Sequence, residues 1–118
     1  MKKLNALLAA GVLGLSAQAQ AAELEVHVQN LTQGIYFTPI LVASHPASSS
    51  LYEIGTEASP ELQQMAEGGN LTGLAGIVTL ASGDVGEQEV ENGLTAPAAT
   101  RVFTLESSEE NSVLSIAA

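Results

Sequence analysis

The sequence predicts a mainly β domain, an antiparallel β-sandwich with one or two short inserted helices. Residues 23–30 and 98–105 alternate in character with a period of two, and residues 112–118 start a further strand, with positions 113, 115 and 117 opposite positions 114, 116 and 118. A period of two is typical of strands that bury one face. Between these segments, residues 59–80 carry helix signals. Strands first, then two short helices and then more strands favour a sandwich with a helical crossover over alternating βαβ units.

The N-terminus has the pattern of a secretory signal peptide. It joins Lys2 and Lys3 to an apolar run over 4–15 and then to an Ala-x-Ala cleavage site that ends at Ala21. The apolar run is shorter than the ~20 residues of a spanning helix, and no later stretch is as long. We therefore expect residues 1–21 to be a signal peptide, residues 22–118 to form a single exported domain, and the location to be periplasmic or extracellular, with no membrane span.

The first predicted strand has one apolar and one polar side. Its apolar side carries Leu24, Val26 and Val28, and its polar side carries Glu23, Glu25, His27 and Gln29. A turn is expected at 32–34. The apolar run over 35–44 contains Pro39, so a strand there should start at or after the proline or lie at an edge. Residues 45–50 have the composition of a loop.

Two short helices are expected in the middle of the chain. Ser59 fits an N-cap, Pro60 the first helical position and Glu61 the positive end of the helix dipole. The apolar stripe of this helix is Leu62, Met65 and Ala66, and Gly68-Gly69 should end it. Asn70 can cap a second helix over 71–78, where apolar residues again recur every three to four positions.

The C-terminal part is expected to return to strands. Residues 81–97 are acidic and rich in glycine, which predicts a long loop with one short exposed strand. A strand over 98–105, a turn over 107–111 and a further buried strand over 112–118 should follow. Because no turn residue or polar tail follows that last strand, we expect the domain to be incomplete at its C-terminus.

Composition excludes several classes of function. The net charge is −10, and without Lys2 and Lys3 the one basic residue is Arg101 against 13 acidic residues. Nucleic-acid binding requires a Lys/Arg footprint, and anionic membranes would repel so acidic a chain. The sequence has no cysteine, which excludes disulfides and thiol chemistry. An acidic solvated surface is the favoured interpretation of the charge.

No catalytic residue is assigned, and the chain is expected not to be an enzyme. A serine hydrolase would need a nucleophile, a histidine and an acid, but the Gly-x-Ser-x-Gly elbow is missing. A small hydrolase using His45 and Asp84 is therefore the less favoured alternative. His27 has only Glu25 as a neighbour for metal binding, so a solvent-facing strand histidine is favoured. A structural role is favoured for His45, which precedes Pro46.

The densest acidic run is Asp84, Glu87, Glu89 and Glu91. Calcium takes about six to eight oxygen ligands, but the EF-hand pattern is missing and a spacing of two describes the wet face of a strand. A solvated face is favoured, and a calcium-stabilised structural module is kept as an alternative. Two glycosylation sequons, at 30–32 and 70–72, are discounted because the signal peptide has a bacterial style.

One stretch of the chain has a familiar order of short motifs. Thr38-Pro39-Ile40 is followed by Ala43-Ser44-His45, Leu51-Tyr52, Ala58-Ser59, Leu62, Met65-Ala66-Glu67 and Gly69-Asn70. This order resembles the spondin N-terminal domain family, in which a Ser/Thr-Pro strand leads to a histidine and a Ser-capped helix ends in an Ala-Glu-x-Gly sequence. The segments 100–103 and 113–115 also resemble the late strands of the family.

The resemblance implies a C2-like β-sandwich, an extracellular location and, as in animal members, adhesion and a calcium site at one end. Family members continue after the last strand into a Pro-x-x-Asp loop that this sequence does not contain, so no metal ligand is assigned and calcium is implied by resemblance alone. We expect an exported, non-enzymatic binding or adhesion module. Its partner would be an extracellular or cell-surface protein or glycan, which the sequence does not identify.

Overall fold

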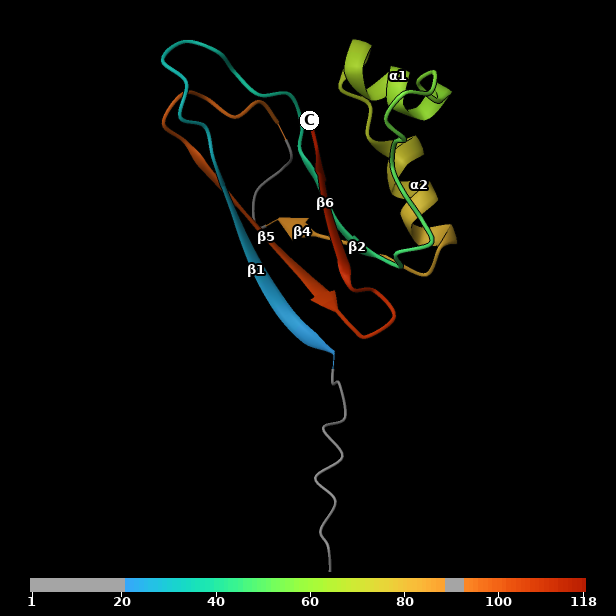
Figure 1. Cartoon of the computed structure of the whole chain (residues 1–118). Helices are drawn as coiled ribbons and strands as arrows, with labels where there is room; N and C mark the ends of the chain where they lie inside the picture. The colour runs from blue at the N-terminus through green and yellow to red at the C-terminus, as the bar shows by residue number, and fades with distance from the viewer. Residues whose placement is uncertain (1–20, 89–92) are drawn as a thin grey trace, which may run out of the picture.

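The computed structural model describes residues 21–88 and 93–118. Strands dominate this part of the chain, and two short helices lie between the second and third strands (Figure 1). The elements are β1 (Ala22–Gln29), β2 (Leu41–His45), α1 (Pro60–Gly68), α2 (Thr72–Leu80), β3 (Asp84–Val85), β4 (Glu87–Gln88), β5 (Thr100–Ser107) and β6 (Val113–Ala117). The predicted signal peptide lies outside the described residues except for its last position, Ala21.

The strands form two antiparallel sheets with the orders β1-β5-β4 and β3-β2-β6. β1 pairs with β5 along its whole length, from Ala22↔Ser107 to Gln29↔Thr100. β2 lies in the centre of the second sheet, between β3 and β6. The predicted mainly β antiparallel fold with short inserted helices is therefore confirmed, while the C2-like sandwich stays a prediction.

β2 is buried on both faces, which explains the nearly continuous apolar run that precedes and includes it. On one face, Ile40 and Val42 pack with Phe103 and Leu105 of β5. The side chains on the other face of β2 pack against the helices, in a cluster that contains Leu41, Ala43, Leu51, Met65, Leu74 and Val78. The sheet that contains β2 therefore has the helices on one side and contacts β5 on the other. The strand starts after Pro39, as expected.

The helix boundaries follow the capping residues that the sequence contains. The Ser59 hydroxyl accepts the backbone N–H of Leu62 at 3.1 Å, and Pro60 is the first residue of α1. Gly69 ends this helix with a φ of 65°, which an L side chain rarely adopts. The Asn70 side chain accepts the N–H of Thr72 at the start of α2. Both predicted helices are confirmed.

The segment between the helices and β5 differs from the prediction of one exposed strand. It contains two strands of two residues each, β3 and β4, and they belong to different sheets. At Gly86, between them, the N–H donates to the Val42 carbonyl at 2.8 Å. A Cβ at this position would lie 3.2 Å from Phe103 Cβ, so glycine lets the chain cross closely between the sheets. Strands of two residues have no detectable period, which is why the sequence did not reveal them.

β6 is not the buried strand that the sequence predicts. It lies at the edge of its sheet, and Leu114 and Ile116 are 45% and 47% exposed. Alternation located the strand correctly, but the burial of its apolar face depends on what lies opposite. Among the described residues, no helix has the length and apolar character needed to cross a bilayer.

Candidate functional site

The two sheets are joined along one side and open along the other. β3 and β4 are consecutive strands at the edges of the two sheets, linked through Gly86, so these edges lie side by side. The strand orders then place β1 and β6 at the opposite edges. Figure 1 shows β1 and β6 on the face turned toward the viewer. In the described part of the chain, no strand pairs with the outer edge of either one.

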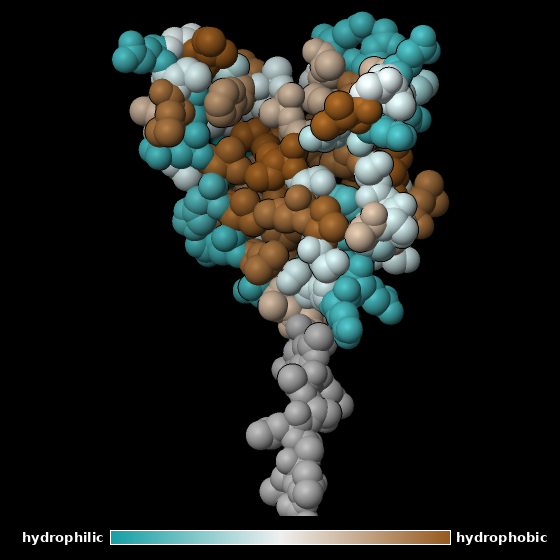
Figure 2. All heavy atoms as spheres, in the orientation of Figure 1, coloured by the Kyte–Doolittle hydropathy of each residue, from teal (hydrophilic) through white to brown (hydrophobic). Residues whose placement is uncertain are grey.

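The apolar side chains that line this open side are partly exposed. Ile116 is the register partner of Val42 and Leu114 that of Ser44, so both face the other sheet. Figure 2 shows hydrophobic surface on this face, over the region between β1 and β6. We call the set Leu24, Val26, Val28, Leu114 and Ile116 the open side. A contiguous exposed apolar area rimmed by polar residues is typical of an interaction surface.

The free edge of β1 also presents backbone hydrogen-bonding groups. Asn30, the residue after β1, donates its N–H toward β5, to the Ala99 carbonyl at 2.9 Å. Because backbone groups alternate between the two edges of a strand, the even positions of β1 face β5. The N–H and C=O groups at the odd positions therefore lie along the free edge, and these are Glu23, Glu25, His27 and Gln29.

The outer face of the β1-β5-β4 sheet carries an acidic strip, made of Glu23, Glu25, Glu87 and Glu106. Glu23 and Glu106 are direct register partners, and like charges at such positions destabilise a sheet. Three members of the strip, together with Asp84, line a pocket of about 270 Å³. Across residues 21–88 and 93–118, no group of three or more His, Asp or Glu side chains could hold a metal ion.

Asp84 has a structural partner. Its Oδ2 accepts the backbone N–H of Glu106 at 2.6 Å, and the Ser44 hydroxyl donates to the Glu106 carbonyl. No residue of β4 lies opposite Glu106, because β4 begins at Glu87, opposite Thr104, and Val85 still belongs to β3 in the other sheet. Of the predicted acidic run, Asp84 therefore bonds to the β5 backbone, Glu87 lies on β4, and Glu89 and Glu91 lie outside the described residues.

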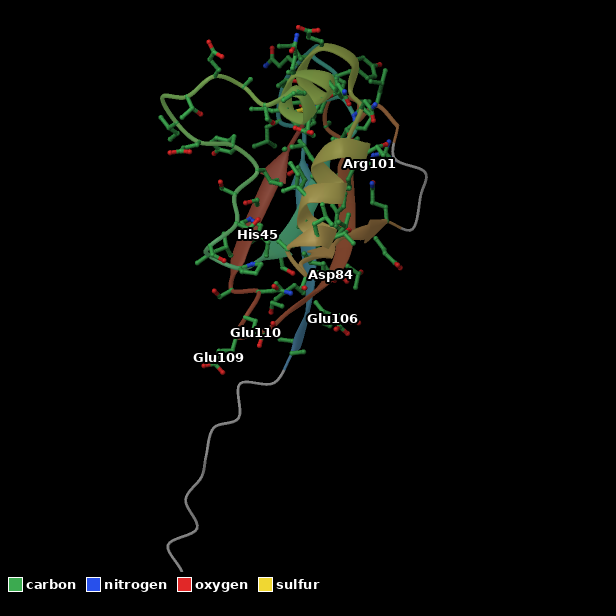
Figure 3. All side chains as sticks on the ribbon, turned by 90° about the vertical axis from the view of Figure 1, so that its right-hand side faces the viewer. His45, Asp84, Arg101, Glu106, Glu109 and Glu110 are labelled. Atoms are coloured by element: carbon green, nitrogen blue, oxygen red, sulfur yellow. The ribbon has the colours of Figure 1, made fainter. Side chains whose placement is uncertain are left out.

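His45 and Asp84, the pair considered for a hydrolase, are not brought together. Asp84 is the register partner of Ser44, and consecutive strand residues point to opposite faces. Figure 3 shows Asp84 close to Glu106 and His45 apart from both. The sheet separates the two side chains, so the structure does not bring together the histidine and the aspartate that the hydrolase alternative would use.

The His45 ring instead contacts Ser115. His45 is 2% exposed, with Nε2 2.7 Å from Ser115 Oγ and Nδ1 2.9 Å from the Pro46 carbonyl oxygen. A carbonyl only accepts, so Nδ1 carries the proton, and in the neutral ring Nε2 accepts the Ser115 hydroxyl proton. No sequence motif singled out Ser115 as a partner of this histidine. Its signal was its position in the alternation of the last strand, on the side of Val113 and Ala117.

Two further polar side chains have identified contacts within the fold. His27 is exposed and its Nε2 contacts Glu25 Oε1, as expected for a solvent-facing strand histidine. Asn30 is fully buried: its Nδ2 donates to the carbonyls of Ile35 and Thr95, and its Oδ1 accepts from Thr32. The amide nitrogen of this sequon is therefore engaged inside the fold.

A second pocket lies between the 50–59 loop and the helices. Its volume is about 330 Å³, and Leu51, Leu62 and Ile77 are among its lining residues. No histidine lines it, and its acidic side chains are Glu53 and Glu57. The open side combines apolar surface, free backbone groups and adjacent charge, so it is the stronger candidate site. Comparison of the chain with protein-family models, curated proteins and solved structures finds no match, and the likeness to spondin N-terminal domains stays a prediction from the sequence.

Proposed function

We propose that this chain is an exported, non-enzymatic binding module that holds a protein partner at its open side. The observation that carries the proposal is the exposure of Leu114 and Ile116, 45% and 47%, on the face of β6 that points toward the other sheet. A partner that covered these two side chains would gain about 25 cal/mol for each Å² of apolar surface removed from water.

The arrangement of the titratable groups supports binding over catalysis. The His45 ring is buried and both of its nitrogens have partners. His27 lies on the open outer face of a sheet rather than in a pocket. A general base must reach a substrate proton, and neither histidine is placed for that. Export is supported by the basic, apolar and Ala-x-Ala pattern of the N-terminus.

The alternative of a calcium-stabilised structural module has less support. The acidic strip supplies carboxylates, but calcium requires several oxygens converging on one point. The carboxylate of Asp84, beside the strip, accepts a backbone N–H, and that of Glu25, within it, contacts His27, so a bound cation would have to replace existing partners. The binding module is therefore the proposal that the geometry favours.

Site-specific photo-cross-linking in the cells that export the protein tests this function. A photoreactive phenylalanine analogue replaces Ile116 in one variant and Leu80 in another, because Leu80 is an 89% exposed leucine at the end of α2. We expect one discrete protein adduct from position 116 and none of that mass from position 80. Failure to form an adduct at 116, or the same adducts at both positions, would contradict the proposal.

A further inference from the structure

The free edge of β1 has unpaired backbone groups, and it lies between the apolar open side and the acidic strip. Together these three features indicate what kind of ligand would bind there. Resting on the proposed function, we infer that the partner presents an extended strand of alternating apolar and basic side chains, and that this strand adds to the free edge of β1. Its backbone would extend the β1-β5-β4 sheet, its apolar side chains would cover the open side, and its basic side chains would lie beside the acidic strip.

The backbone requirement follows from the register of β1. The strand is 8 residues long, and the outward groups at positions 23, 25, 27 and 29 are unpaired by any strand among the described residues. An extended chain satisfies such a row of groups with regular hydrogen bonds, the mode known as β-augmentation. Neither a helix nor a glycan presents donors and acceptors at this spacing.

The inner face of the added strand would have to be apolar. Successive side chains of a strand point to opposite faces, so every second residue would lie beside Leu24, Val26 or Val28. Those residues would also face Leu114 and Ile116 of β6, which the present sheets leave about half exposed. Large or β-branched apolar side chains fill that space best.

The outer face of the added strand would have to be basic. Its remaining side chains would lie beside Glu23 and Glu25 on the outer surface, where Glu23 already faces Glu106. Glu109 and Glu110, both exposed, follow β5 in the turn at the same end of the sheet (Figure 3). Arg101, the one Lys or Arg among the described residues, donates to the Leu94 carbonyl at the opposite end of β5. The partner would therefore supply the missing cations.

The charges also argue against two other arrangements, in which a second copy of this chain is the partner or the partner strand pairs with the edge of β6. A second β1 would place glutamates beside glutamates, in a chain of net charge −10. β6 is only 5 residues long, and the residues on its helix side are Val113, Ser115 and Ala117, which carry no charge. An alternating apolar and basic strand gains opposite-charge neighbours only at β1.

Defined peptides test the inference on the purified exported chain. The probe is a labelled peptide of about nine residues in which isoleucine and lysine alternate, enough to span β1. The controls are an isoleucine and glutamate peptide of the same pattern and an isoleucine and lysine peptide with the two residue types in separate blocks. We expect the alternating lysine peptide to bind at least about tenfold more tightly than either control, and to lose affinity as salt rises.

Variants of the protein then test separately how the backbone groups of the β1 edge and the charges of the acidic strip contribute to binding. His27→Pro removes an amide hydrogen from the free edge and leaves the β5 ladder intact, since proline is tolerated at edge strands. We expect it to weaken binding about tenfold more than His27→Ala, which removes the same side chain and keeps the backbone N–H. The double variant Glu23→Gln and Glu25→Gln should also weaken binding, whereas Glu61→Gln with Glu67→Gln on α1 should leave it unchanged.

A pair of modified peptides keeps the test independent of variant folding. One version of the lysine peptide is N-methylated at its isoleucines and the other at its lysines. Because only one set of N–H groups faces the neighbouring strand, we expect one version to bind the unmodified protein and the other to lose binding. Equal binding of both versions would overturn strand addition, and equal binding of the lysine and glutamate peptides would overturn the charge assignment.

Adding the alternating lysine peptide to the cross-linking experiment tests the strand inference separately from the proposed binding function. If the adduct at position 116 forms and the alternating lysine peptide suppresses it, both stand. If the adduct forms but the peptide leaves it unchanged, the binding function stands and the strand inference fails. If no adduct forms at position 116, the proposed function itself fails.

Discussion

Asp84 accepts the backbone N–H of Glu106 with its Oδ2 atom 2.6 Å from the nitrogen. The bond extends the β4–β5 ladder with a side chain from β3, just before the chain crosses to β4. Ser44, the register partner of Asp84, donates its hydroxyl to the carbonyl of the same Glu106 residue. Two side chains of one sheet therefore satisfy the backbone of a strand in the other.

Removing the Asp84 carboxylate should cost stability whether or not calcium is present. We expect Asp84→Ala to lower the free energy of unfolding by about 1–2 kcal/mol, since it leaves the Glu106 N–H without its charged acceptor. Glu87→Ala, on the exposed outer face, should change it by less than about 0.5 kcal/mol. Urea unfolding with and without millimolar calcium measures both. An effect of Asp84→Ala that appears only with calcium would favour the calcium-stabilised alternative.

Asn30 should be among the most sensitive polar positions. Asn30→Asp places a carboxylate against the carbonyls of Ile35 and Thr95, where the amide nitrogen now donates. Because the residue is fully buried, we expect a loss of about 2–4 kcal/mol. The matched change Asn70→Asp lies exposed at the start of α2 and keeps its acceptor oxygen, so it should be neutral or slightly stabilising. Thermal unfolding of the two variants checks the contrast.

Two glycines should respond to alanine in opposite directions. A Cβ at Gly83 would lie 2.5 Å from the Ser44 carbonyl oxygen and 2.7 Å from Val78 Cγ1. We therefore expect Gly83→Ala to lower the free energy of unfolding by about 1–3 kcal/mol. At Gly76, inside α2, nothing lies within 4 Å, and Gly76→Ala should raise it by about 0.5–1 kcal/mol. A Gly83→Ala variant as stable as the wild type in urea would show that Gly83 is not packed closely against Ser44 and Val78.

The contact between Ser115 and His45 should contribute to stability and not to hydrolysis. We expect Ser115→Ala to lower the free energy of unfolding by about 1 kcal/mol, because it leaves His45 Nε2 buried without a donor. The wild-type chain should not react with a fluorophosphonate, which labels activated serines. Labelling that disappears in Ser115→Ala but persists in Ser112→Ala would instead establish a nucleophilic serine.

Export should be visible in the mass of the protein. When residues 1–118 are expressed in a bacterium, we expect the periplasmic fraction to contain a chain that begins at Ala22, because Ala19 and Ala21 form the small-residue cleavage pattern. Intact-mass spectrometry identifies the first residue. Ala21→Asp should block the processing. A full-length chain confined to the cytoplasm would contradict the predicted signal peptide.

The elements with local signals were predictable to within one or two residues. Alternation over the first strand predicted both its position and its wet face, since the glutamates and His27 are exposed. Ser59, Pro60 and Gly69 predicted the ends of α1, because caps act through hydrogen bonds within a few residues. The candidate site was less predictable: the alternation of the last strand separated Leu114 and Ile116 from Ser115, but it did not indicate which face would be covered.

The sequence by itself determined the strand faces, the helix caps and the acidic charge, because each depends on neighbours along the chain or on composition alone. Only the tertiary structure decided that β3 and β4 belong to different sheets, that Asp84 bonds to Glu106, that His45 contacts Ser115 and that β1 and β6 share an open side. These relationships join residues far apart in sequence, Ser115 and His45 lying 70 positions apart. A local pattern limits which side of a strand a residue occupies, whereas the partner on that side is chosen by how the whole chain packs.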